Sequence, residues 1–554
     1  MRRARGGPPG GRVRRSGLRG PGELLPLLLL LAVALWFWPR AGAVPGLPLD
    51  APPWWGAPRD QLLDGPDAGE WARNALLLSD GRLSALDHHR MPGWLVVLAA
   101  GHQLIPDVVL VGHLGNRLLH VVTVVAAYVL GRAGGGRAGG LLAGALVLGI
   151  DALAVTAQRF GVDAAVSAAV TGSLAAAALA ARWGVLAPLA GAVAGWATGV
   201  HYTTLPFALP ALVVLLLRGG PGLGRRVLLA LGFAAGFGAV GAGLWAIWPA
   251  PDLHTFLQDI ANGARPGARG DGTVGDVGGL VETLRARVPL ALGRAVGVGL
   301  SGVGVPRAAL GVAAVAVWLG VAGLGLRGRR PGRLVGWDPG LGLGLLCALA
   351  PLPIFVAVGA PARYGENLLP VVAVLLARGV VGVAAVADAG VGARVRGWPA
   401  RTLPTLAALA VGAAVVWGAA PRRGPRPLSQ PEVGTLLLAD ALRENFPSGT
   451  EIACPVREAI VMAGLGYCPE RICPLTADDA AFRACVEVLD AECAGEGPIG
   501  YIATNATHLY DPNALGRRPM DAWVDATHGR VATVSYRDFE AVVHHIPRPA
   551  AGPP

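Results

Sequence analysis

Long apolar stretches follow one another along most of this 554-residue chain. The longer ones reach the roughly 20 residues with which a helix crosses a bilayer, and several are rich in Gly and Ala, which permits close contact between helices in lipid. Charged residues make up only 15 % of the chain, whereas ordinary soluble domains have about 25 %, so a soluble domain and a disordered chain are both excluded. The chain is therefore predicted to be an all-α polytopic membrane protein with about 11 transmembrane helices. The spans are expected at 23–39, 105–131, 138–157, 164–181, 184–200, 203–217, 227–248, 308–326, 339–358, 367–388 and 402–420.

The basic residues indicate membrane topology and no nucleic acid. The net charge is +11, and every one of the 47 basic residues is arginine. The arginines form short runs between apolar stretches without interleaved aromatic residues, which is typical of cytoplasmic loops and untypical of a strand-binding surface. Residues 1–22 are accordingly predicted to be a basic cytoplasmic N-terminus, and the outer loops are predicted at 40–104 and 249–307. A cleaved signal peptide at the N-terminus is the alternative, and it also places the next segment outside.

The last part of the chain, residues 421–554, has shorter apolar runs and carries five of the six cysteines. A Cys-containing domain on the outer side fits an oxidising compartment, with two disulfides and one thiol left over. A zinc site is the weaker alternative, because the nearest spacing is Cys468-x4-Cys473. The pattern predicts a small soluble α/β or α+β domain. Its helices are expected at 433–445 and 480–489, and its strands at 500–503 and 530–535.

The first outer loop contains a predicted helix that begins near Asp67. Spacing of three and four residues places Asp67, Glu70, Trp71 and Asn74 on one face of this helix. Carboxylates beside an aromatic ring just above a bilayer suit a polar ligand with a ring, such as a sugar, whereas capping of the helix is the alternative role for Asp67. The apolar piece at 91–104 follows and is too short to span, so it is expected to be interfacial or re-entrant.

Further polar residues occur in a fixed order at the predicted outer ends of spans. They are Arg90-Met91-Pro92-Gly93-Trp94, Asn116-Arg117, Gln158-Arg159-Phe160-Gly161-Val162-Asp163 and Arg363-Tyr364-Gly365-Glu366-Asn367-Leu368-Leu369-Pro370. With the acidic helix at Asp67, this order resembles the GT-C superfamily of polyprenol-phosphate-sugar glycosyltransferases, and within it the protein mannosyltransferase and aminoarabinose transferase type. The resemblance covers residues 20–420, and the order and topology carry it more than any single motif does.

The resemblance implies a sugar transfer at the outer face of the membrane. The donor would be a polyprenyl-phosphate-linked sugar, and the acceptor a lipid, a glycan or a protein. Asp67 is the candidate base that takes the acceptor proton, with Asp163 as the second catalytic carboxylate. The arginine fork suits a departing phosphate, and Arg363 is the first candidate for this contact. The substrate-binding residues implied are Glu70, Trp71, Arg117, Arg159, His201, Tyr202, Arg363 and Tyr364.

Alternatives remain for several of these residues. Each arginine can also snorkel from a span end, and His201 and Tyr202 can anchor a helix at the interface. The loop 249–307 is expected to be either a lid or a spacer. The family pattern has a second acid directly after the first Asp, where this chain has Ala68. Asp67 and Asp163 remain as the candidate ligands of a divalent cation, Mg or Mn.

The resemblance implies the inner (plasma) membrane of a bacterium, with a cytoplasmic N-terminus and a periplasmic or extracellular C-terminal domain. Two other functions stay open. A multi-pass transporter would use Asp151, the main ionisable residue inside a predicted span. A membrane-anchored envelope assembly protein would act through its cysteine-bearing tail.

Overall fold

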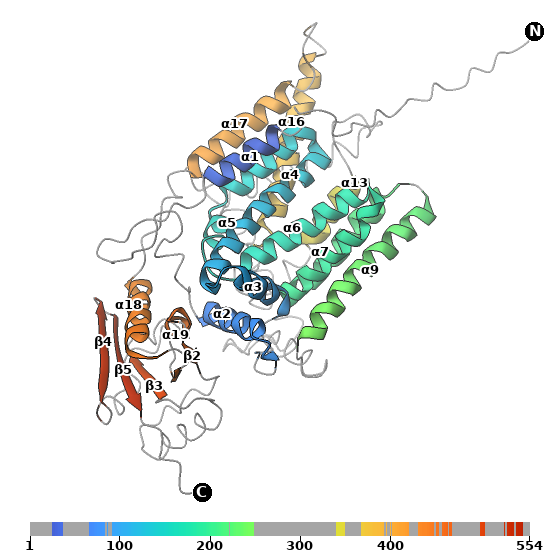
Figure 1. Ribbon diagram of the computed structural model, residues 1–554. Helices are drawn as coiled ribbons and strands as arrows, with labels where there is room; N and C mark the ends of the chain where they lie inside the picture. Colours follow the sequence, from blue (N-terminus) through green and yellow to red (C-terminus); the bar gives the residue numbers. More distant parts are fainter. Residues whose placement is uncertain are drawn as a thin grey trace, which may run out of the picture.

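The computed structural model describes a bundle of helices and, beside it, a sheet formed by the C-terminal part of the chain (Figure 1). The residues that it describes are 25–36, 66–83, 86, 91–220, 222–248, 339–349, 367–392, 395, 399, 402–419, 430–447, 450–453, 457–463, 465–467, 499–504, 526, 529–536 and 539–546. The helical elements of the bundle are α1 (Leu25–Trp36), α2 (Pro66–Ser79), α3 (Pro92–Leu104), α4 (Val108–Gly149), α5 (Asp151–Thr156), α6 (Asp163–Ala180), η4 (Gly184–Leu186), α7 (Ala187–Val200), η5 (Tyr202–Phe207), α8 (Ala208–Arg218), α9 (Leu223–Ile247), α13 (Pro339–Leu349), α16 (Leu369–Gly392) and α17 (Thr402–Ala419).

Apolar helices occur at most of the predicted spans. Within the described part of the chain, α4, α6, α9 and α16 are long and apolar enough to cross a membrane, and five further apolar helices are shorter. The predicted span at 308–326 and the second half of the one at 339–358 lie outside the described residues, as does the loop 249–307. The helical class is thus confirmed, whereas the count of about 11 spans stays a prediction.

The 42-residue helix α4 consists of two helices that run across a kink at Gly136, where φ is 66° and ψ is −158°. This positive φ favours glycine, which explains the Gly-rich turn between the spans predicted at 105–131 and 138–157. The two arms touch closely, because a Cβ on Gly131 would overlap the backbone of Gly139. The second predicted span is wrong at its end. The helix stops at Gly149, and extended backbone at Ile150 separates it from α5.

Small residues also bring α7 and α9 into backbone contact. A Cβ on Gly191 would overlap the carbonyl of Phe233, and one on Gly236 would overlap the carbonyl of Pro188. The opposite face of α9 exposes large apolar side chains such as Leu231, which is 60 % accessible. Close packing on one face and exposed apolar side chains on the other are what a helix at the lipid boundary shows.

Arginines close the end of the bundle at which α6 finishes. Arg218 donates to the carbonyl of Ala178 at 3.1 Å, and Arg225 donates to the carbonyl of Ala181 at 3.1 Å. These carbonyls end a helix and have no partner within it, so the cations satisfy them and favour the negative end of the helix dipole. Arg218 and Arg225, which belong to a loop that the sequence predicts inside, therefore lie at the opposite end of α6 from Asp163.

The described residues of the tail form a five-stranded sheet with the order β2-β1-β3-β5-β4. Strands β2, β1 and β3 pair in parallel, and β5 pairs antiparallel with β3 and β4. The elements are α18 (Gln430–Asn445), β1 (Glu451–Ala453), α19 (Arg457–Met462), β2 (Gly466–Tyr467), β3 (Ile499–Thr504), β4 (Arg530–Tyr536) and β5 (Phe539–Ile546). Helix α18 packs against β4 and β5, with Phe539 against Gly434. The five cysteines of the tail and the helix predicted at 480–489 lie outside the described residues.

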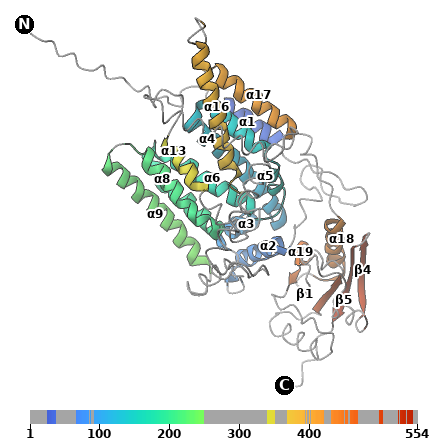
Figure 2. The same ribbon diagram turned by 180° about the vertical axis from the view of Figure 1, so that it is seen from behind.

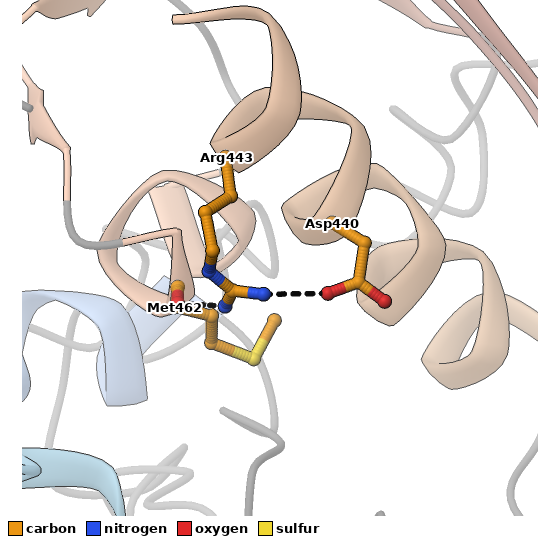
Figure 3. A network of polar contacts seen from close by, with 3 residues as sticks. All are labelled: Asp440, Arg443 and Met462. Carbon is orange, nitrogen blue, oxygen red and sulfur yellow. Dashed lines mark hydrogen bonds and ion pairs between the residues drawn. The ribbon is translucent and has the colours of Figure 1, made fainter. Parts of the chain in front are cut away.

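A polar network joins α18 and α19 (Figure 3). Arg443 of α18 forms an ion pair with Asp440 at 2.7 Å and donates to the carbonyl of Met462 at 2.8 Å. Met462 is the last residue of α19, and α19 packs against α2. Arg443 therefore fixes α19, the short helix through which the tail contacts α2.

Removal of Arg443 is expected to loosen α19. The Arg443–Asp440 ion pair is half exposed, and such pairs contribute about 0–1 kcal/mol. The Met462 bond is the larger effect, because the carbonyl at the end of α19 loses its donor, which costs about 1 kcal/mol. Hydrogen–deuterium exchange over residues 457–463 of the whole protein should therefore rise severalfold in Arg443→Ala and change little in Asp440→Asn. Equal exchange in the two variants would contradict this account.

Candidate functional site

Helix α2 carries the first group of predicted site residues and lies at the end of the bundle nearer the C-terminal sheet (Figures 1 and 2). Asp67 is its second residue, in the first turn, and the Asp67 side chain lies outside the described part. Glu70 is half-buried, whereas Trp71 is 3 % exposed and Asn74 is fully buried. Trp71 belongs to the hydrophobic core, so its contribution to this face of α2 is packing.

Helix α3 joins α2 to the bundle. Its Gly93 approaches the backbone of Gly199 and Val200 so closely that a Cβ would overlap them, and the indole nitrogen of Trp196 donates to the Gly93 carbonyl at 2.9 Å. The buried ring of Trp94 lies against Gly115 of α4. The 13-residue helix predicted to be interfacial thus packs between α2, α4 and the end of α7.

The turn between α5 and α6 contains two more predicted site residues. Arg159 is exposed, and Asp163 is half-buried as the first residue of α6. Asn116 of α4 donates its side-chain amide to the carbonyls of Arg159 at 2.7 Å and Gly161 at 2.9 Å. The neighbouring Arg117 is only 7 % exposed, so a guanidinium is buried at the level of this turn.

Apolar packing supports the same turn. The Phe160 ring is 3 % exposed and lies over Gly112, where a Cβ would overlap it. The ring also meets the edge of His113, with centroids 6.0 Å apart. Gly112 and Asn116 are four residues apart and share a face of α4, so one face contacts both the ring and the backbone of the turn.

A second cross-link joins α6 to the start of α16. Ser167 donates to the side-chain oxygen of Asn367 at 2.9 Å, and both residues are buried. Ser167 lies one helical turn after Asp163. Asn367 lies four residues after Arg363 in the sequence, and Arg363 and Tyr364 themselves lie outside the described residues.

The other predicted contacts belong to the end of α7. His201 is half-buried and ends α7, with its N–H donating to the carbonyl of Ala197. Tyr202 begins η5, and its side chain lies outside the described part. Helix α7 also contacts α3, so His201 follows directly on the backbone that Gly93 touches.

These contacts bring several predicted residues to one end of the bundle. Helix α2, the start of α4, the turn before α6 and the end of α7 are linked through α3 and Asn116. In the described ranges, no three His, Cys, Asp or Glu residues come together as metal ligands. The Asp67 side chain lies outside these ranges, and Mg²⁺ is commonly held by one or two carboxylates with water as the other ligands, so a divalent-cation site at Asp67 and Asp163 stays a prediction.

Sequence reasoning gave no role to Asn116, Ser167 or Asn367. A signal exists for Asn116, because an uncharged amide inside a predicted span is costly unless it is hydrogen-bonded. Its partners are backbone carbonyls 43 and 45 residues away, so the pattern does not reveal them. Ser167 and Asn367 are 200 residues apart, and only the folded chain shows them to be partners.

Comparison with known proteins gives no matching family model and no matching curated relative. Solved structures do match. One is ArnT from Cupriavidus metallidurans bound to undecaprenyl phosphate, with a TM-score of 0.57 and 17 % identity, over 96 % of this chain and 100 % of ArnT. Another is the oligosaccharyltransferase AglB from Archaeoglobus fulgidus in complex with an inhibitory peptide and a dolichol-phosphate. Its TM-score is 0.52 and its identity 13 %, over 96 % of this chain and 75 % of AglB.

At these identities the likeness concerns the fold. Both matches extend over almost the whole of this chain, so the helical bundle and the C-terminal part are included in the alignment. The apolar helices and these neighbours together indicate a multi-pass membrane protein. The fold that the order of polar residues led us to expect is therefore confirmed: the chain shares the fold of ArnT and AglB.

Proposed function

We propose that this chain is a membrane glycosyltransferase that moves a sugar from a polyprenyl-phosphate donor to an acceptor at the outer face of the membrane. The observation that carries the proposal is the shared fold over 96 % of the chain with ArnT, a protein that binds undecaprenyl phosphate. AglB, which has the same fold, binds dolichol-phosphate and a peptide. A polyprenyl-phosphate sugar is therefore the donor, and the acceptor is a lipid, a glycan or a protein.

The proposed reaction is a displacement at the anomeric carbon of the donor sugar. The acceptor hydroxyl attacks that carbon, and the bond from the carbon to the phosphate oxygen breaks as positive charge develops on the sugar ring. Asp67 takes the proton of the hydroxyl. The products are the glycosylated acceptor and polyprenyl phosphate, whose added negative charge is stabilised by arginine.

The proposed roles follow the positions of the described residues and, for Arg363 and Tyr364, the order of the sequence motifs. Asp67 belongs to α2, which the C-terminal part contacts through α19, so the acceptor approaches from that side. Arg117 lies in α4 and Arg159 in the turn before α6, and with Arg363, which the order of the sequence motifs indicates, they bind the phosphate. Asp163, Glu70, His201, Tyr202 and Tyr364 line the sugar and orient it, whereas Trp71, which is buried in the core, supports this face of α2 by packing.

The proposed location is the inner (plasma) membrane, with the N-terminus in the cytoplasm and the C-terminal part outside. The arginine-closed end of α6 then faces the cytoplasm, in agreement with the positive-inside rule. A transporter stays the alternative, and its candidate residue Asp151 is the first residue of the short helix α5.

Mass spectrometry of the envelope in a deletion strain of the source organism tests the proposal. Loss of the gene should remove one sugar from one class of envelope lipid, glycan or protein, and should leave the polyprenyl-phosphate form of that sugar in excess. Complementation with the wild-type chain should restore both. An unchanged set of glycans together with loss of a solute-uptake activity would instead support a transporter.

A further inference from the structure

We propose that Asn116 is a positioning residue of the donor side of the site: it fixes the turn 157–162 and thereby sets the places of Arg159 and Asp163. The inference rests on the proposed function, because the turn matters for transfer only if these two residues act on the donor. It assigns Asn116 a role that is distinct from direct contact with the substrate.

The contact geometry is specific. The side-chain nitrogen of Asn116 lies 2.7 Å from the carbonyl oxygen of Arg159 and 2.9 Å from that of Gly161. Both neighbours are acceptors, so the amide nitrogen must face them, and each of its two hydrogens serves one carbonyl. The side chain is fully buried, where an amide without partners would be costly. Two bonds from one rigid side chain therefore fix the backbone on either side of Phe160.

The fixed backbone continues directly into the candidate site. Arg159 carries one of the bonded carbonyls, and Gly161 lies two residues before Asp163 at the start of α6. The residue after Asn116 is the buried Arg117. One turn of α4 therefore carries Arg117 and, through the bonds of Asn116, positions Arg159 and Asp163. The Ser167–Asn367 bond then joins the same helix, α6, to the start of α16.

Packing alone does not provide this precision. Phe160 fills the space over Gly112, which keeps the turn against α4, but an aromatic ring on a glycine can slide. The amide bonds to two carbonyls determine the backbone direction. Loss of the amide donors should therefore leave the protein folded, with Phe160 still buried, and release the turn.

Kinetics of transfer separate positioning from a general structural role. Asn116→Asp keeps the size of the side chain and replaces the two donors by an oxygen that faces two carbonyls. Its donor KM should rise and its kcat fall, each about tenfold or more, while its acceptor KM stays unchanged, because α2 is untouched. Asn116→Ala removes the donors without adding a charge and should show the same split.

Thr123→Val is the matched control. Thr123 is a buried polar residue of the same helix, but it donates within the helix to the Leu119 carbonyl at 2.8 Å, so its loss leaves the turn in place. A fall in kcat with both KM values unchanged in the Asn116 variants would indicate a smaller folded fraction and would overturn the inference. Kinetics of the Asn116 variants equal to those of Thr123→Val would overturn it as well.

Limited trypsin digestion tests the inference with a measurement that does not depend on sugar transfer. The chain has no lysine, so trypsin cuts only after arginine, and Arg159 is exposed in the turn. Cleavage after Arg159 should be about tenfold faster in both Asn116 variants than in the wild type, whereas cleavage after the exposed Arg82 should be unchanged. Equal rates at Arg159 would overturn the inference, even if the wild type transfers sugar. If cleavage after Arg159 is faster in the Asn116 variants and the wild-type protein transfers no sugar, then Asn116 fixes the turn but the proposed function is wrong.

Discussion

Asp67→Asn is expected to abolish sugar transfer almost completely. The amide has the size of the carboxylate but cannot accept the proton of the acceptor hydroxyl, and a general base contributes about 10²–10⁴ in rate. The loss should therefore appear in kcat, at about a thousandfold, with the donor KM nearly unchanged, because Asp67 acts on the acceptor. Steady-state transfer rates with a saturating donor measure this effect.

Asp80→Asn is the matched control for Asp67. Asp80 directly follows the same helix, is exposed, and lies at the far end from the proposed base. The same change of charge there should leave transfer within a factor of about two, since surface substitutions have small effects. If Asp67→Asn transfers sugar as fast as Asp80→Asn does, Asp67 is not the base.

Arg363→Ala is expected to lower transfer by about 10²–10³. The departing phosphate gains negative charge as its bond to the sugar breaks, and removal of one donor aimed at such a developing charge has an effect of that size. Arg363→Lys keeps the charge but lacks the planar fork, so its activity should lie between those of the wild type and Arg363→Ala. Turnover of the donor and its KM are the measurements, and both should worsen.

Arg82→Ala provides the comparison for Arg363. Arg82 is exposed in the turn after α2, so its removal changes the net charge equally without affecting a span end. Equal activity of Arg82→Ala and Arg363→Ala would show that Arg363 does not bind the leaving phosphate, and Arg159 and Arg117 would then be the candidates to replace next.

The sequence predicted the helical bundle well because apolar periodicity and glycine act locally. The turn at Gly136 has a conformation that glycine favours, so the boundary between the two arms of α4 was visible in the sequence. The break at Ile150 was not visible. Ile150 is apolar, and the apolar run continues through it, so nothing in the composition marks the end of the helix.

In the tail, two predicted strands coincide with β3 and β4, whereas β5 was missed. Strand β5 lies between β3 and β4, and its Ala541, Val542, Val543 and His544 are all fully buried. A strand that is covered on both faces shows no alternation of apolar and polar residues, which is the pattern that identifies a strand. Helix α19, with six residues, is too short for its periodicity to be recognised.

The candidate site was predictable as a set of polar residues at span ends, because such residues are costly near lipid. Their supports were not predictable. Asn116 bonds to carbonyls on a distant turn, and Gly93 contacts the end of α7 through backbone alone. An amide inside a predicted span marks Asn116 as a residue in need of a partner, but residue type and spacing do not reveal the partner of either contact, since that partner is the main chain.

Transfer by the purified chain tests the central claim most directly. The wild-type protein is reconstituted in vesicles with lipid extracts and acceptor fractions from the source organism, and mass spectrometry follows every polyprenyl-phosphate sugar. The account predicts that one of these lipids is consumed, that an equal amount of polyprenyl phosphate appears, and that an acceptor gains the mass of one sugar, none of which occurs with Asp67→Asn. A folded wild-type protein that consumes no polyprenyl-phosphate sugar under these conditions would contradict the account.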